Sequence, residues 1–154
     1  MRRALLAAIA TVALTVAPAR SEDRLVLGPR QFEADKSGKG AVLCTWSLYL
    51  STRTLAAACE LPRQPADDAI DRAIAEIDDF ILANSSLHPD RAALERFKRD
   101  AADSELALAR RRGLDSACRN DMVKFLRNLP PEKIEASVKA LLATPREPVM
   151  NPCL

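Results

Sequence analysis

The residues with the clearest chemistry in this chain are its four cysteines. Consecutive cysteines are 15, 59 and 35 residues apart, whereas structural zinc sites use closely spaced pairs of cysteine or histidine ligands. The spacing therefore argues against a metal site, and we predict neither a metal nor another cofactor. An even number of cysteines in an exported chain favours two disulfides. These cysteines are Cys44, Cys59, Cys118 and Cys153.

A second group of side chains has the types and spacing of a binding site. Trp46 and Tyr49 are the only Trp and Tyr of the chain. With Arg53 they lie three and four residues apart, which places them on one face of a helix. Two interpretations remain open: core packing with the Tyr hydroxyl at the rim, or a pocket for a small molecule or a partner.

No arrangement typical of an enzyme accompanies these residues. The single histidine, His88, follows Ser85 in a polar stretch, but no G-x-S-x-G sequence provides the strained turn of a serine hydrolase. The carboxylates between residues 67 and 79 are expected on a solvated helix face, where nothing shifts their pKa values toward catalysis. We therefore predict that the protein is not an enzyme.

The N-terminus has the pattern of a secretory signal peptide. Arg2 and Arg3 precede an apolar run over residues 4–17, and Ala17-Pro18-Ala19 forms an A-x-A cleavage sequence. The run is shorter than the roughly 20 residues of a membrane anchor. We expect residues 1–19 to be removed and the mature protein to be periplasmic or secreted, with no membrane attachment.

The charge of the mature chain argues against a nucleic-acid partner. The whole chain has 23 basic and 21 acidic side chains, and loss of Arg2 and Arg3 makes the two numbers equal. Affinity for phosphates depends on excess positive charge. Six aromatic residues are also too few to form a stacking platform for bases.

The remaining pattern predicts an all-α fold: a compact up-down bundle of four to five helices, linked by two disulfides. Residues 20–40 are predicted to form a flexible N-terminal arm, and residues 41–154 the helical domain. Isoleucines at positions 70, 74, 77 and 81 give the clearest apolar stripe. The prolines at 145, 148 and 152 predict an extended C-terminal tail. Expected helices cover residues 41–61, 65–84, 89–112, 115–129 and 131–142.

The short connection before Pro89 predicts that the second and third helices form an antiparallel hairpin. In the third helix, Leu94, Phe97, Ala101, Ser104 and Leu108 have the spacing of an a/d seam. The hairpin would place the basic segment 110–112 beside the acidic start of the second helix at Asp67, Asp68 and Asp71. Residues 110–112 suit a helix C-terminus, and a phosphate or an acidic partner is the functional alternative.

Helix geometry favours one pairing of the cysteines. No Gly or Pro interrupts the stretch between Gly40 and Pro62. A continuous helix would separate Cys44 from Cys59 by roughly 22 Å, far beyond the about 4.4–6.8 Å between bridged Cα atoms. We therefore prefer the pairs Cys59–Cys118 and Cys44–Cys153. A helix break near residue 51 would instead give Cys44–Cys59 and Cys118–Cys153.

Two segments, Tyr49–Leu55 and Pro145–Leu154, resemble parts of small exported bacterial proteins of no known role, and the resemblance implies no activity. The helical four-cysteine format is also similar to that of periplasmic immunity and inhibitor proteins. We expect a non-enzymatic exported protein that binds a protein partner, as an inhibitor, immunity or accessory protein. The alternative is a small-ligand carrier or sensor with a pocket near Trp46, Tyr49 and Arg53.

Overall fold

The computed structural model describes residues 29–151 and residue 153. The predicted signal peptide and residues 20–28 of the predicted arm lie outside these residues. The regular secondary structure of the described residues is helical, apart from one isolated β-bridge between Ala34 and Asn151. Its elements are a short 3-10 helix (Pro29–Phe32), α1 (Val42–Ala58), α2 (Pro65–Asn84), α3 (Arg91–Arg112), α4 (Leu114–Cys118), α5 (Asp121–Arg127) and α6 (Pro131–Leu141).

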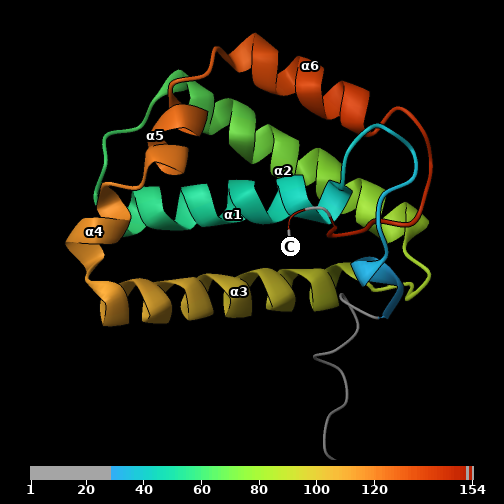
Figure 1. The fold of residues 1–154 in the computed structure, drawn as a ribbon, viewed down its shortest axis with the longest axis horizontal. Helices are drawn as coiled ribbons and strands as arrows, with labels where there is room; N and C mark the ends of the chain where they lie inside the picture. Colours follow the sequence, from blue (N-terminus) through green and yellow to red (C-terminus); the bar gives the residue numbers. More distant parts are fainter. Residues whose placement is uncertain (1–28, 152, 154) are drawn as a thin grey trace, which may run out of the picture.

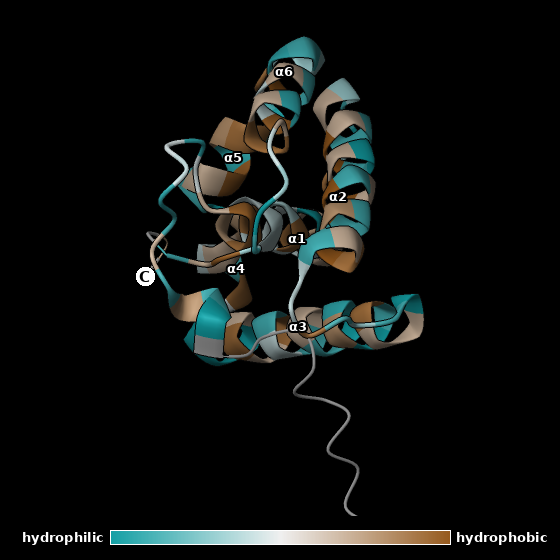
Figure 2. Cartoon of the chain, turned by 90° about the vertical axis from the view of Figure 1, so that its right-hand side faces the viewer, coloured by the Kyte–Doolittle hydropathy of each residue, from teal (hydrophilic) through white to brown (hydrophobic). Residues whose placement is uncertain are grey.

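Helix α1 is the centre of the fold. It contacts α2, α3, α4 and α5, and Figures 1 and 2 show it surrounded by the other helices. Every residue of α1 except Ala57 is buried or half-buried, because the helix has neighbours on several sides. The long helices α1, α2 and α3 run in alternating directions (Figure 1). The predicted all-α bundle is therefore confirmed.

The isoleucine stripe of α2 forms much of the core. Ile70, Ile77 and Ile81 are buried, and Ile74 packs against them at the edge. Pro65 occupies the first turn, where its missing N–H costs nothing, and Asp67 and Gln64 form a capping box. The stripe packs on α1 and α6, so the second predicted helix is confirmed at both ends.

The predicted helix over residues 115–129 is wrong as one element, because it is divided into α4 and α5. The side chain of Asn120 accepts hydrogen bonds from the backbone N–H groups of Met122 and Val123, and so begins a new helix. The new direction turns Val123 and Leu126 inward. It leaves Met122 and Phe125 48% and 60% exposed.

The predicted pairing of residues 110–112 with the start of α2 is also wrong. Helix α1 lies between α2 and α3 (Figure 1), so the two are not packed along their length as a hairpin. The side chains at 110–112 are exposed. Arginines from α1, the α1–α2 loop and α5 hold the acidic residues instead.

Two disulfides connect α1 to the rest of the chain. Cys59, at the end of α1, is bonded to Cys118 at the end of α4, with Cα atoms 5.7 Å apart. Cys44, in the first turn of α1, is bonded to Cys153 in the tail, with Cα atoms 5.3 Å apart. The preferred pairing is thus confirmed, and its cause is the unbroken α1.

The described part of the N-terminal arm is held by the extended C-terminal tail. The backbone N–H of Met150 donates to the carbonyl of Gln31 over 2.7 Å. The guanidinium of Arg146 contacts Asp35 at 3.1 Å and donates to the carbonyl of Gly40 at 2.7 Å. Hydrophobic patterning does not reveal these polar contacts. They place Met150 of the tail beside the N-terminal half of α1, where Ser47 contacts its sulfur.

Candidate functional site

The three residues predicted as a binding site have different environments. Trp46 and Tyr49 are 1% and 5% exposed and belong to the main core. Burial raises the pKa of the Tyr49 hydroxyl. Arg53 points to the start of α2, where it forms ion pairs with Asp67 at 3.0 Å and Asp71 at 2.7 Å. Trp46 alone of the three reaches a cavity between α1 and α3.

Trp46 is fixed by a buried polar contact and an aromatic contact. Its indole N–H donates to Asp78 over 2.8 Å, and its ring stacks on Phe97 with centroids 5.6 Å apart. The second carboxylate oxygen of Asp78 pairs with Lys98 at 2.6 Å. Burial alone would lower the pKa of Lys98, but its contacts with Asp78 and Glu95 raise it. Lys98 is therefore a firmly charged partner of Asp78.

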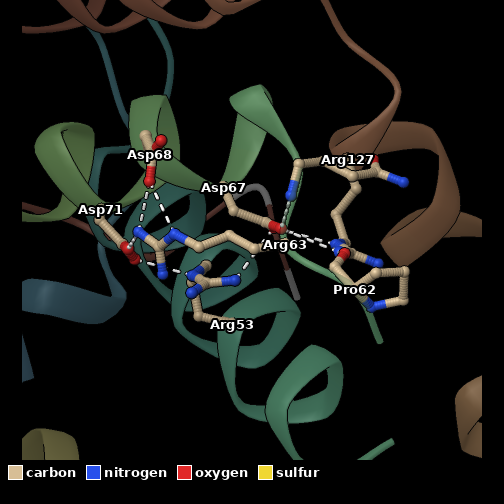
Figure 3. A network of polar contacts seen from close by, with 8 residues as sticks. Arg53, Pro62, Arg63, Asp67, Asp68, Asp71 and Arg127 are labelled. Carbon is tan, nitrogen blue, oxygen red and sulfur yellow. Dashed lines mark hydrogen bonds and ion pairs between the residues drawn. The ribbon is translucent and has the colours of Figure 1, made fainter. Parts of the chain in front are cut away.

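Asp67 is the centre of a second buried polar cluster (Figure 3). Its side chain is fully buried and forms two parallel hydrogen bonds with Arg127, at 2.9 and 2.8 Å. Arg53 and the backbone N–H of Gln64 contact the same carboxylate. Arg127 also donates to the carbonyl of Pro62. This cluster joins α1, the α1–α2 loop, α2 and α5.

The burial of Asp67 and Asp78 corrects the expectation that the carboxylates of residues 67–79 lie on a solvated face. Asp68 and Asp79 are exposed as expected. Asp67 and Asp78 are buried because each has a cationic partner from another helix. Both carboxylates are thus engaged in structural contacts, and neither opens onto the cavity between α1 and α3.

Acid is expected to weaken the fold through Asp67. The hydrogen bond from Arg127, together with the Gln64 N–H and the charge of Arg53, outweighs burial and lowers the pKa of Asp67 from 3.8 to about 2. The ionised group therefore contributes stability above pH 3.8 that is lost as the pH falls through about 2. The shift corresponds to roughly 2 kcal/mol. Urea unfolding at pH 6, 4 and 2.5 should show this loss, and an Asp67→Asn variant should show a smaller pH slope.

The cavity between α1 and α3 has a volume of about 160 Å³. Trp46 and Phe97 form one end of it, and Met150 of the tail forms a wall. Phe97, Ala101 and Leu108, three residues of the predicted seam in α3, remain only half-buried. The seam therefore does not close fully against α1. The residues around the cavity are Trp46, Ser47, Leu50, Ser51, Thr54, Phe97, Ala101, Ala102, Glu105 and Met150.

A second cavity of about 200 Å³ continues along the same helices toward α4. Glu105 borders both cavities, and the two neighbouring cavities together are called here the α1–α3 groove. Leu55 and Leu108 contribute apolar surface to the second cavity, while Arg112 and Asn120 contribute polar groups. The α1–α3 groove is thus apolar near Trp46 and polar near Arg112. Sequence spacing indicated the seam but not that it stays open.

The remaining sequence candidates do not join this groove. His88 is exposed in the loop before α3 and has a positive φ of 48°. Within residues 29–151 and at 153, no three side chains of metal-ligating type are grouped as a site. No helix in that part of the chain combines the length and apolar character needed to cross a membrane.

Comparisons of this chain with family models, curated proteins and solved structures find no match.

Proposed function

We propose that this protein is a non-enzymatic, exported binding protein, and that a protein partner inserts an apolar side chain into the α1–α3 groove. The observation that carries the proposal is the apolar cavity of about 160 Å³ beside Trp46. Disulfides at both ends of α1 support it, because they fix one wall of the groove before the partner binds. The buried carboxylates Asp67 and Asp78 support binding over catalysis, since cations already occupy them.

The size of the cavity favours a side chain over a larger free ligand. An apolar cavity of about 150 Å³ holds one benzene ring, so this cavity has room for one phenylalanine or leucine side chain. Pockets for drug-sized ligands enclose about 300–1,000 Å³. Buried anchor residues of this kind dominate many protein interfaces. The small-ligand carrier predicted as an alternative would have to bind a ligand of benzene size.

Two intramolecular disulfides are typical of proteins that fold outside the cytoplasm. Together with the pattern of residues 1–19, they support a periplasmic or secreted location as part of this proposal. We therefore expect the protein partner to be periplasmic or secreted as well.

A comparison of two phenylalanine variants tests the proposal. Ala101→Phe places a ring in the cavity, because Ala101 borders it. Ala107→Phe makes the same change at an exposed position of the same helix. We expect wild type and Ala107→Phe to capture one specific protein from a periplasmic extract, and Ala101→Phe to lose it. The captured protein, once purified, should bind Ala101→Phe at least about tenfold more weakly, a loss of about 1.4 kcal/mol.

Equal affinity of the two variants for that protein would contradict the proposed site. Thermal unfolding of both variants must be similar for the comparison to count, and circular dichroism measures this. If no protein is captured but benzene changes the fluorescence of Trp46, the chain's only Trp, the small-ligand function replaces the proposed one.

A further inference from the structure

The arginine segment at the end of α3 differs from the arginines around the start of α2. Arg53, Arg63 and Arg127 are held in ion pairs at the start of α2. No ion pair engages Arg110, Arg111 or Arg112 within the residues that the structure describes. All three are exposed, so their charges are available to another molecule.

Arg112 connects this charge to the α1–α3 groove. Its side chain borders the second cavity together with Ser116 and Asn120, which have polar side chains. The groove therefore begins at the apolar Trp46 end and finishes at a basic end. Arg112 follows Phe97 by fifteen positions in α3, which corresponds to roughly 22 Å along the helix. An extended peptide of about seven residues covers this distance.

The charged side chains near the basic end determine which sign of charge a partner segment carries there. Asp115 and Asp121 are exposed on α4 and α5, and Asp121 is paired with Lys124. Arg119, also exposed, adds to the charge of residues 110–112. Positive charge is thus in excess at this end. The excess is larger than the partial negative charge, about half an elementary charge, that the α3 dipole places at the helix C-terminus.

We propose that the partner segment is apolar at one end and acidic at the other, and that it lies extended along the α1–α3 groove. This inference rests on the proposed function and specifies the chemistry of the partner. The apolar end enters the cavity at Trp46, and its carboxylates contact Arg112 and Arg111. Glu105, which borders both cavities and has no ion pair in the described chain, faces the middle of the segment. The middle is therefore uncharged or donates a hydrogen bond.

Two fluorescein-labelled peptides of seven residues test this inference with the full oxidised protein. Both carry leucine and phenylalanine at the amino end and serines in the middle; one ends in two glutamates and the other in two lysines. Anisotropy at 50 mM salt should show that the acidic peptide binds about tenfold more tightly, since the arginines attract its two glutamates and repel the two lysines of the other peptide. The difference should shrink at 500 mM salt because of screening.

Two charge reversals provide the matched controls. Arg112→Glu should remove the preference for the acidic peptide, whereas Arg99→Glu, an exposed position of α3 away from both cavities, should keep it. Equal binding of both peptides, lost in Ala101→Phe, would overturn the acidic partner and leave the proposed function intact. Binding of neither peptide up to 1 mM, or equal effects of both reversals, would also overturn this inference.

Discussion

Replacement of Cys44 and Cys153 by serine is expected to lower the free energy of unfolding by about 4 kcal/mol. The disulfide spans 109 residues, so its removal gives the unfolded chain a large gain in conformational entropy. The second disulfide and the main core remain, and the variant should keep its helical circular dichroism. Denaturation by guanidinium without reducing agent measures the loss.

The same variant should also weaken binding in the α1–α3 groove. Met150, three residues before Cys153, forms a wall of the cavity. Without the disulfide, only noncovalent contacts hold it there, such as the bond from the Leu43 N–H to the Val149 carbonyl. Unchanged stability would contradict the role of this disulfide. Non-reducing peptide mapping checks the pairing itself, since a Cys44–Cys59 bond would give a peptide pair confined to residues 40–62.

Asp67→Ala is expected to cost a similar amount, about 3–5 kcal/mol, by a different mechanism. The substitution leaves Arg127 buried and without its carboxylate partner, and loss of one member of a buried ion pair has this typical cost. It also removes the capping contact with Gln64 at the start of α2. Urea unfolding at pH 7, followed by far-UV circular dichroism, gives the value.

Glu135→Ala is the matched control for this prediction. It breaks the ion pair between Glu135 and Arg72, in which both side chains are more than half exposed. The free energy of unfolding should therefore fall by less than about 1 kcal/mol. A double variant, Asp67→Leu with Arg127→Met, should recover much of the stability that Asp67→Ala loses, because no buried charge remains unpaired. Equal losses in Asp67→Ala and Glu135→Ala would contradict the importance of burial.

The parts of the fold that the sequence predicted depend on long-range regularity. The stretch between Gly40 and Pro62 contains one continuous helix, α1 (Val42–Ala58), and its length alone excluded a bond between Cys44 and Cys59. The isoleucine stripe of α2 likewise fixed a buried face. Both signals extend over several helical turns, so no single local preference overcomes them.

The parts that the sequence did not predict depend on individual polar contacts. Asp67 and Asp78 have the same residue type as the exposed Asp68 and Asp79. The buried pair differs because each of its members contacts a cationic side chain from another helix, Arg127 for Asp67 and Lys98 for Asp78. Asn120 divides α4 from α5 through its side-chain oxygen.

The candidate site was predicted in part. Trp46 does border the α1–α3 groove, but Tyr49 is in the core and Arg53 is engaged with α2. Residue spacing placed all three on one face of a helix. It did not reveal that α1 has different neighbours on adjacent sides, because the positions of α2 and α3 depend on packing between distant segments.

Site-specific photo-cross-linking tests most directly whether a protein partner binds in the α1–α3 groove. A benzophenone side chain is placed at Ala102, which borders the cavity, or at Ala136, an exposed position of α6. Irradiation with the purified partner should give a covalent adduct from position 102 and none from position 136. An adduct from position 136 alone, or equal yields from both, would contradict binding in the groove.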